Sequence, residues 1–134
     1  MRRIAIYIAV LFTALTGVKA QDTFSIVAVD ASTGEVGSAG ASCIANSIII
    51  SDMHPGVGAI HTQAWWTTVN QNAARARMQA GDSPDQIITW LQNNDNPAEG
   101  GGVQDRQYAV VDINGGVGRS AAFTGTNNWD QKGH

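Results

Sequence analysis

The sequence has few of the residues that build cross-linked or metal-bound proteins. It contains one cysteine, Cys43, so a disulfide within the chain is excluded. We expect this thiol to be buried and inert, with a reactive thiol as the alternative. The three histidines, His54, His61 and His134, are scattered, with no cysteine or carboxylate at zinc-ligand spacing. We therefore predict no metal site.

Long apolar runs are missing except at the start of the chain. There Arg2-Arg3 precedes an apolar run from Ile4 to Leu15, and Val18-Lys19-Ala20 has small residues where a signal peptidase cleaves. This pattern predicts a secretory signal peptide over residues 1–20, cleaved after Ala20, because the run is too short to cross a bilayer. A retained N-terminal anchor is the alternative. We expect a secreted or periplasmic domain over residues 21–134, with no membrane span after cleavage.

Positive charge is scarce in that domain. The predicted signal peptide contains Arg2, Arg3 and Lys19, so residues 21–134 keep five basic against eleven acidic residues, a formal charge of −6. Such a surface does not attract nucleic acid or anionic lipid, so we expect no nucleic acid partner. Gly100-Gly101-Gly102 lacks the flanking strand and the Gly-Lys-Ser/Thr of a phosphate-binding loop. We predict no cofactor, and a homo-oligomer is left open.

Residues 23–42 carry the clearest pattern. Phe24 to Val29 is a short β-branched run, Asp30 to Gly34 has turn chemistry, and a second run starts at Glu35, which predicts a β-hairpin. The second arm, Gly37 to Ser42, consists of small residues, so some group must approach its backbone closely. One interpretation is the floor of an active site. The other is a sheet that needs small residues to pack a helix.

Four more strands are predicted from apolar, β-rich runs. They cover residues 44–50, 57–63, 108–112 and 117–123. The last two flank Asn114-Gly115, a strong signal for a tight hairpin turn.

Two helices are predicted between these strands. Apolar residues at intervals of three and four indicate a helix from Thr67 to a stop at Gly81. The N-cap Ser83, Pro84 at the first position and Gln86 at capping-box spacing indicate a second helix. The order ββββ-αα-ββ predicts an α+β fold in which the helices lie on antiparallel sheet.

One histidine falls inside a predicted strand. His61 shares a face with Val57 and Ala59 in the strand over residues 57–63. A histidine satisfied within the sheet is our main interpretation, and a catalytic histidine is the alternative. In a third functional hypothesis Cys43 is a nucleophile with His61 as its base.

Several short motifs occur in order along the chain. They are Thr23–Asp30, Thr33–Gly37, Ala41-Ser42, Gly56–Ala59, Thr62–Ala64, Val110–Asp112, Ala121–Gly125, Trp129 and Gly133-His134. Over essentially all of residues 23–134 they resemble an uncharacterised bacterial and archaeal family, the domain of unknown function numbered ten twenty-eight. The resemblance implies a fold similar to N-terminal nucleophile (Ntn) hydrolases, an αββα sandwich. It also implies that the family pattern continues past His134, so we expect a C-terminally truncated domain with part of its apolar sheet surface exposed.

The resemblance further implies where the chemistry lies. Ntn hydrolases carry a Thr, Ser or Cys nucleophile at the start of the first strand, and that position is Thr23 here. Its free α-amine would act as base for its own hydroxyl. Ser25 shares a face with Thr23, and Ser42 ends the neighbouring strand, so both are candidate site residues. Cleavage after Ala20 leaves Gln21-Asp22 in front of Thr23, so this chemistry requires a further cut.

Two classes of function follow. The first is a secreted hydrolase of amide C–N bonds that acts on a cell-wall or peptide-like substrate, as the peptidoglycan-binding appendage of some similar proteins suggests. The second is a non-catalytic, envelope-associated binding module on the same scaffold. The residues alone do not decide whether the protein is an enzyme.

Overall fold

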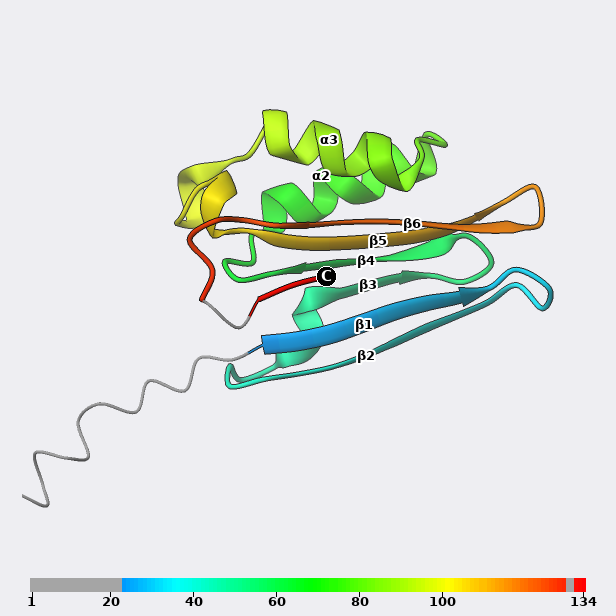
Figure 1. The fold of residues 1–134 in the computed structure, drawn as a ribbon, viewed down its shortest axis with the longest axis horizontal. Helices are drawn as coiled ribbons and strands as arrows, with labels where there is room; N and C mark the ends of the chain where they lie inside the picture. The colour runs from blue at the N-terminus through cyan, green and yellow to red at the C-terminus, as the bar shows by residue number, and fades with distance from the viewer. Residues whose placement is uncertain (1–22, 130–131) are drawn as a thin grey trace, which may run out of the picture.

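The computed structural model describes residues 23–129 and 132–134. Two helices, a four-stranded sheet and a two-stranded sheet form three stacked layers (Figure 1). The elements are β1 (Thr23–Asp30), β2 (Glu35–Ser42), η1 (Ser47–Ile50), β3 (Ser51–His54), β4 (Gly58–Gln63), α2 (Thr68–Gln79), α3 (Pro84–Asn93), η2 (Pro97–Glu99), η3 (Val103–Asp105), β5 (Gln107–Asn114) and β6 (Val117–Thr124). The predicted signal peptide lies outside the described residues.

All strand pairs are antiparallel. β1 pairs with β2, and the larger sheet has the order β3-β4-β5-β6. The predicted tight turn joins β5 to β6 through Gly115 and Gly116, whose φ angles of 59° and 78° match the twist of a two-residue hairpin. At Gly58 a Cβ atom would overlap the carbonyl oxygen of Val111, so only glycine lets β4 and β5 pair there. The predicted α+β fold with two helices is confirmed.

Both helices begin with a side-chain N-cap, and the cap at Ser83 was predicted. The Thr67 side chain accepts a hydrogen bond from the Asn70 amide at 3.2 Å at the start of α2. At α3 the Ser83 hydroxyl accepts from the Gln86 amide, and the Gln86 side chain accepts from the Ser83 amide, which completes the predicted capping box.

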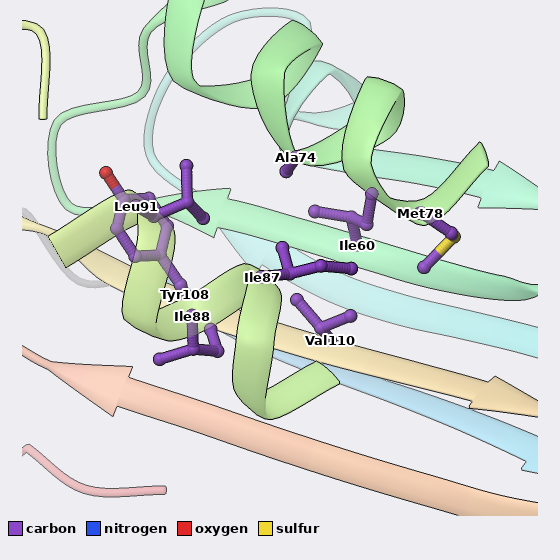
Figure 2. Close-up of a cluster of buried hydrophobic side chains, with 8 residues drawn as sticks. All are labelled: Ile60, Ala74, Met78, Ile87, Ile88, Leu91, Tyr108 and Val110. Carbon is purple, nitrogen blue, oxygen red and sulfur yellow. The ribbon is translucent and has the colours of Figure 1, made fainter. Parts of the chain in front are cut away.

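The apolar core lies between the helices and the middle of the larger sheet (Figure 2). Its buried members are Ile60, Ala74, Met78, Ile87, Ile88, Leu91, Tyr108 and Val110. They come from α2, α3, β4 and β5. The apolar residues of each helix recur about every 3.6 positions and so form one face, which packs on one face of the sheet. Each large aliphatic side chain buried here stabilises the fold by about 1.5–3 kcal/mol.

The strand predicted over residues 44–50 is wrong. The chain there forms a turn and η1, which begins after Asn46 in the left-handed region at φ 64°. The partner of β4 is instead β3, with Ser51 opposite His61. The isoleucines favour a strand only when a partner strand lies beside them, and here Ile48 is 73% exposed while Ile50 is buried.

The hairpin β1–β2 covers the face of the larger sheet opposite the helices (Figure 1). Residues 23, 25, 27 and 29 alternate inward and are half-buried, whereas Phe24 and Ile26 are 71% and 66% exposed. Two large apolar side chains of β1 are therefore exposed on the outer face of this hairpin. Within the described ranges no helix covers that face, so the fourth layer of an αββα sandwich is not confirmed.

A buried ion pair ties the loop after α3 to the sheet. The fully buried Arg106 donates through Nε to Asp95 Oδ1 at 2.8 Å and through Nη1 to the Trp65 carbonyl at 2.7 Å. Asn70 Nδ2 donates to the same Asp95 oxygen at 2.7 Å and to the Tyr108 hydroxyl at 2.9 Å. A buried charge is tolerated only when it is paired and hydrogen-bonded. This network therefore fixes the path of the chain from α3 to β5.

Replacing Asp95→Asn should lower the free energy of unfolding by about 3 kcal/mol, because it leaves Arg106 buried without its counter-charge. Urea unfolding measures this. Asp82→Asn is the matched control, because Asp82 pairs with the partly exposed Arg77 and should cost less than about 1 kcal/mol. Equal losses in the two variants would contradict the assignment of Asp95 as a structural anchor.

Candidate active site

The predicted nucleophile lies at the inward-facing start of β1. Thr23 pairs in register with Ser42, and their hydroxyl oxygens share a hydrogen bond of 2.8 Å. Both side chains are half-buried. The two predicted site residues are thus brought together by the register of the hairpin.

The small-residue arm does permit a close approach. A Cβ atom on Gly40 would lie 2.9 Å from the carbonyl oxygen of Phe24 and 3.1 Å from Cβ of Ser25. At Gly37, by contrast, a Cβ atom meets nothing within 4 Å. The requirement for a missing side chain is therefore specific to Gly40, opposite Ser25.

Ser25, the third predicted site residue, makes a contact across the two sheets. Its hydroxyl donates to Gln63 Oε1 at 2.8 Å, and Gln63 Nε2 donates to Gln107 Oε1 at 2.5 Å. Ser25 shares the inner face of β1 with Thr23 two residues away, about 7 Å along the strand. The structure thus places Ser25 beside the Thr23–Ser42 pair but bonds it to a different partner.

This chain of hydrogen bonds continues to residues 133 and 134. Gln107 Nε2 donates to Thr124 Oγ1 at 3.1 Å and to the carbonyl oxygen of Gly133 at 2.9 Å. Thr124 Oγ1 also shares a hydrogen bond of 2.9 Å with His134 Nδ1. We call Ser25, Gln63 and Gln107 the amide ladder. It connects the hairpin with the last described residues.

A cavity of about 450 Å³ lies between the hairpin and the larger sheet. Its lining includes all three residues of the amide ladder, together with His61, Gly133 and His134. Thr23 does not line the cavity. It lies on the same face of β1 as Ser25, which does line it, two residues away. A second depression of about 370 Å³ over α3 contains none of the predicted site residues. The cavity between the sheets is therefore the candidate site.

His61 reaches the interior of this cavity from β4. Its Nε2 shares a hydrogen bond of 2.6 Å with Ser38 Oγ, which also bonds Ser51 Oγ at 2.8 Å. Its Nδ1 is buried and has no hydrogen-bond partner among the described residues. Burial lowers the pKa of His61 below its ordinary value of 6.5, so the ring is neutral at pH 7. The prediction of a histidine whose ring is hydrogen-bonded within the sheet thus holds for Nε2 and not for Nδ1.

The expectation of a buried Cys43 is wrong, because this side chain is exposed. It follows β2, where the chain turns toward η1 and leaves the sheet. The imidazole of His61 bonds Ser38 on β2 instead. The geometry therefore gives no support to a Cys43–His61 nucleophile and base.

Gln63, Gln107 and Ser38 are site residues that the sequence analysis missed. Each sits at an inward position of a strand, where an alternating pattern would call for an apolar residue. Polar residues at such positions were the available signal. Their partners lie 38, 44 and 23 residues away along the chain, which no local pattern specifies.

No group of three or more histidine, cysteine, aspartate or glutamate side chains in the described part of the chain is placed to hold a metal ion. Over the same residues, no helix is both long and apolar enough to span a membrane. What the cavity offers is hydroxyls, carboxamides and a neutral imidazole, set among apolar side chains such as Val27 and Ala122. These groups bind and orient polar ligands through hydrogen bonds.

The molecule is an α+β protein with a cleft of mixed polar and apolar lining between two antiparallel sheets. The chain belongs to DUF1028, a family of unknown function, whose family model matches residues 23–134. The resemblance read from the motifs is thereby confirmed. Searches of curated proteins and of solved structures gave no match.

The neutral state of His61 makes stability depend on pH. The folded protein favours the neutral ring, so the unfolded chain binds the proton at the higher pH and stability falls as the pH drops below about 6.5. We expect His61→Gln to flatten this loss, measured as the free energy of unfolding between about pH 7.5 and about pH 5. The control His134→Gln removes an exposed histidine and should keep the loss. An unchanged slope in His61→Gln would contradict the assignment.

Proposed function

We propose that this protein is a secreted or periplasmic amide hydrolase of the N-terminal nucleophile type, with Thr23 as its nucleophile. The observation that carries the proposal is the hydrogen bond between Thr23 Oγ1 and Ser42 Oγ, on the inner face of the hairpin beside the cleft. A hydroxyl that is held by a neighbour near a cavity is positioned to attack a carbonyl bound there. The chemistry requires that the residues before Thr23 be removed.

In the proposed reaction the free amine of Thr23 takes the proton from its own Oγ1. The oxygen adds to the amide carbonyl, the C–N bond breaks, and the leaving amine takes that proton. Water then hydrolyses the ester on Oγ1, which releases the acid and restores the hydroxyl. Ser42 orients Oγ1 of Thr23 for attack through their hydrogen bond. The substrate lies in the cavity that Ser25 lines.

Support for an amide substrate comes from the lining of the cleft. The Gln63 and Gln107 side chains are themselves carboxamides and carry the same donor and acceptor groups as a peptide bond. Each is bonded head to tail with the next, so the lining presents amide groups in fixed directions. A cell-wall peptide or another peptide-like molecule matches this chemistry.

A second candidate function is a non-catalytic binding module. It is favoured by the amide ladder, whose hydrogen bonds do not involve Thr23 and whose residues line the cavity without it. On this proposal the cleft retains a ligand and Thr23 serves only to close the end of the hairpin.

The test begins with the mass of the mature protein. For a hydrolase we expect a species that starts at Thr23, and release of amine from peptide amides or cell-wall fragments. Thr23→Ala should reduce kcat/KM by about a thousandfold or more, because the nucleophile is gone. Thr33→Ala in the exposed hairpin turn is the control and should retain activity.

A mature terminus at Gln21, with no species starting at Thr23, would rule out the self-activated mechanism. Equal turnover by Thr23→Ala and the parent would rule out Thr23 as nucleophile. Ligand retention that survives Thr23→Ala, in a protein without turnover, would support the binding module.

A further inference from the structure

We propose that the cavity between the sheets binds an amide that carries an uncharged aliphatic acyl group, with the amide at one end of the cavity and the acyl chain along the rest. The inference rests on the proposed function, because it places the substrate of that reaction in the same cavity. It goes further by naming the chemistry of the acyl side of the substrate.

The strand alternation shows which side chains of β5 face the cavity. Tyr108 and Val110 belong to the apolar core beneath the helices. Gln107, Ala109 and Val111 alternate with them, so their side chains lie on the opposite face of the sheet, toward the hairpin. All three of these residues line the cavity. One face of β5 thus belongs to the core and the other to the cavity.

Small residues form the middle of the cavity floor. Ala109 and Ala122 lie directly opposite each other on β5 and β6, and both line the cavity. An alanine side chain ends at Cβ, so this pair leaves space that larger side chains would fill. Val27 on β1 and Val111 on β5 extend the apolar lining. The resulting volume of about 450 Å³ lies within the range of sites that hold small molecules.

The hairpin crosses this floor in a defined direction. Ser25, near the start of β1, bonds Gln63, which pairs with Gln107 at the start of β5. Val29, near the end of β1, lies beside Gly118, where a Cβ atom would be 3.2 Å from Cγ2 of that valine. Gly118 pairs with the far end of β5. β1 therefore runs past β5 in the same direction.

Both strands change from polar to apolar along that direction. The inward-facing residues are Thr23, Ser25, Val27 and Val29 on β1, and Gln107, Ala109, Val111 and Ile113 on β5. A ligand with one polar and one apolar end fits this gradient in one orientation, because only its polar end needs hydrogen-bond partners. The carbonyl of an amide then lies at the Thr23 end, as attack by Thr23 requires, and its acyl chain extends toward Val111.

The lining of the cavity disfavours a charged ligand. Among the described residues that line it there is no aspartate, glutamate, lysine or arginine. Burial lowers the pKa of His61, so this ring is neutral at pH 7. An ionised group in the cavity would lose its hydration without gaining a counter-charge. The acyl chain that fits is therefore uncharged.

The test measures binding of butanamide and hexanamide to the full chain by NMR, with the side-chain amide signals of Gln63 and Gln107 as reporters. Thr23→Ala is present throughout, so hydrolysis plays no part in the result. Hexanamide should bind about tenfold more tightly than butanamide, because its two extra methylene groups are buried. 6-Aminohexanamide, whose chain ends in an ammonium group, should bind about tenfold more weakly than hexanamide or not at all.

A second pair of variants tests where the acyl chain lies. Ala122→Leu fills the cavity floor and should reduce the preference for hexanamide over butanamide to about twofold or less. Ala39→Leu makes the same change on the exposed outer face of the hairpin and should keep the preference.

Equal affinities for butanamide and hexanamide would overturn the proposal, and so would hexanamide binding that leaves both reporter signals unmoved. A preference that survives Ala122→Leu would place the chain elsewhere and overturn it as well. An intact acyl preference in a protein whose parent form shows no turnover would rule out the hydrolase and support the acyl site.

Discussion

Strand β4 imposes the constraint on which the rest of the structure depends, because all six of its residues are buried. A strand with both faces covered needs a layer on each side. On one side Ile60 packs into the apolar core with the helices. On the other, His61 and Gln63 need hydrogen-bond partners, and the hairpin supplies them as Ser38 and Ser25. The hydrogen-bonded groups in the cleft are therefore a consequence of what β4 carries on its second face.

Hydrogen-bonded polar side chains between two sheets stabilise their packing less than apolar side chains would. Buried hydroxyls and carboxamides lose their water, and their internal hydrogen bonds return only about 0.5–1.5 kcal/mol each. Apolar side chains of similar size at Ser25, Gln63 and Gln107 would pack the same space without that cost. Departures from the simplest core are expected at functional sites. The amide ladder is such a departure, and it lies where the cavity is.

The sequence predicted correctly those features that depend on residues close together along the chain. Ser83 and Gln86 lie three residues apart, and the glycine turn between β5 and β6 joins adjacent strands, so local chemistry alone determined both. The run of isoleucines at residues 48–50 misled because strand preference depends on a partner that only the fold supplies. The Asp95–Arg106 anchor could not be predicted for the same reason, because it joins two loop residues and also needs Asn70 from α2.

The candidate site also depends on contacts between residues that are distant along the chain. Thr23 and Ser42 face each other because eight consecutive residue pairs fix the hairpin register, and a slip by one residue would turn Phe24 inward in place of Thr23. Gly40 holds that register, since any side chain there would press on the Phe24 carbonyl and on Ser25. Shifting β2 by one position would bring Ala39 or Ala41 to this crowded place. Gly40 thus favours the pairing that places Ser42 opposite Thr23.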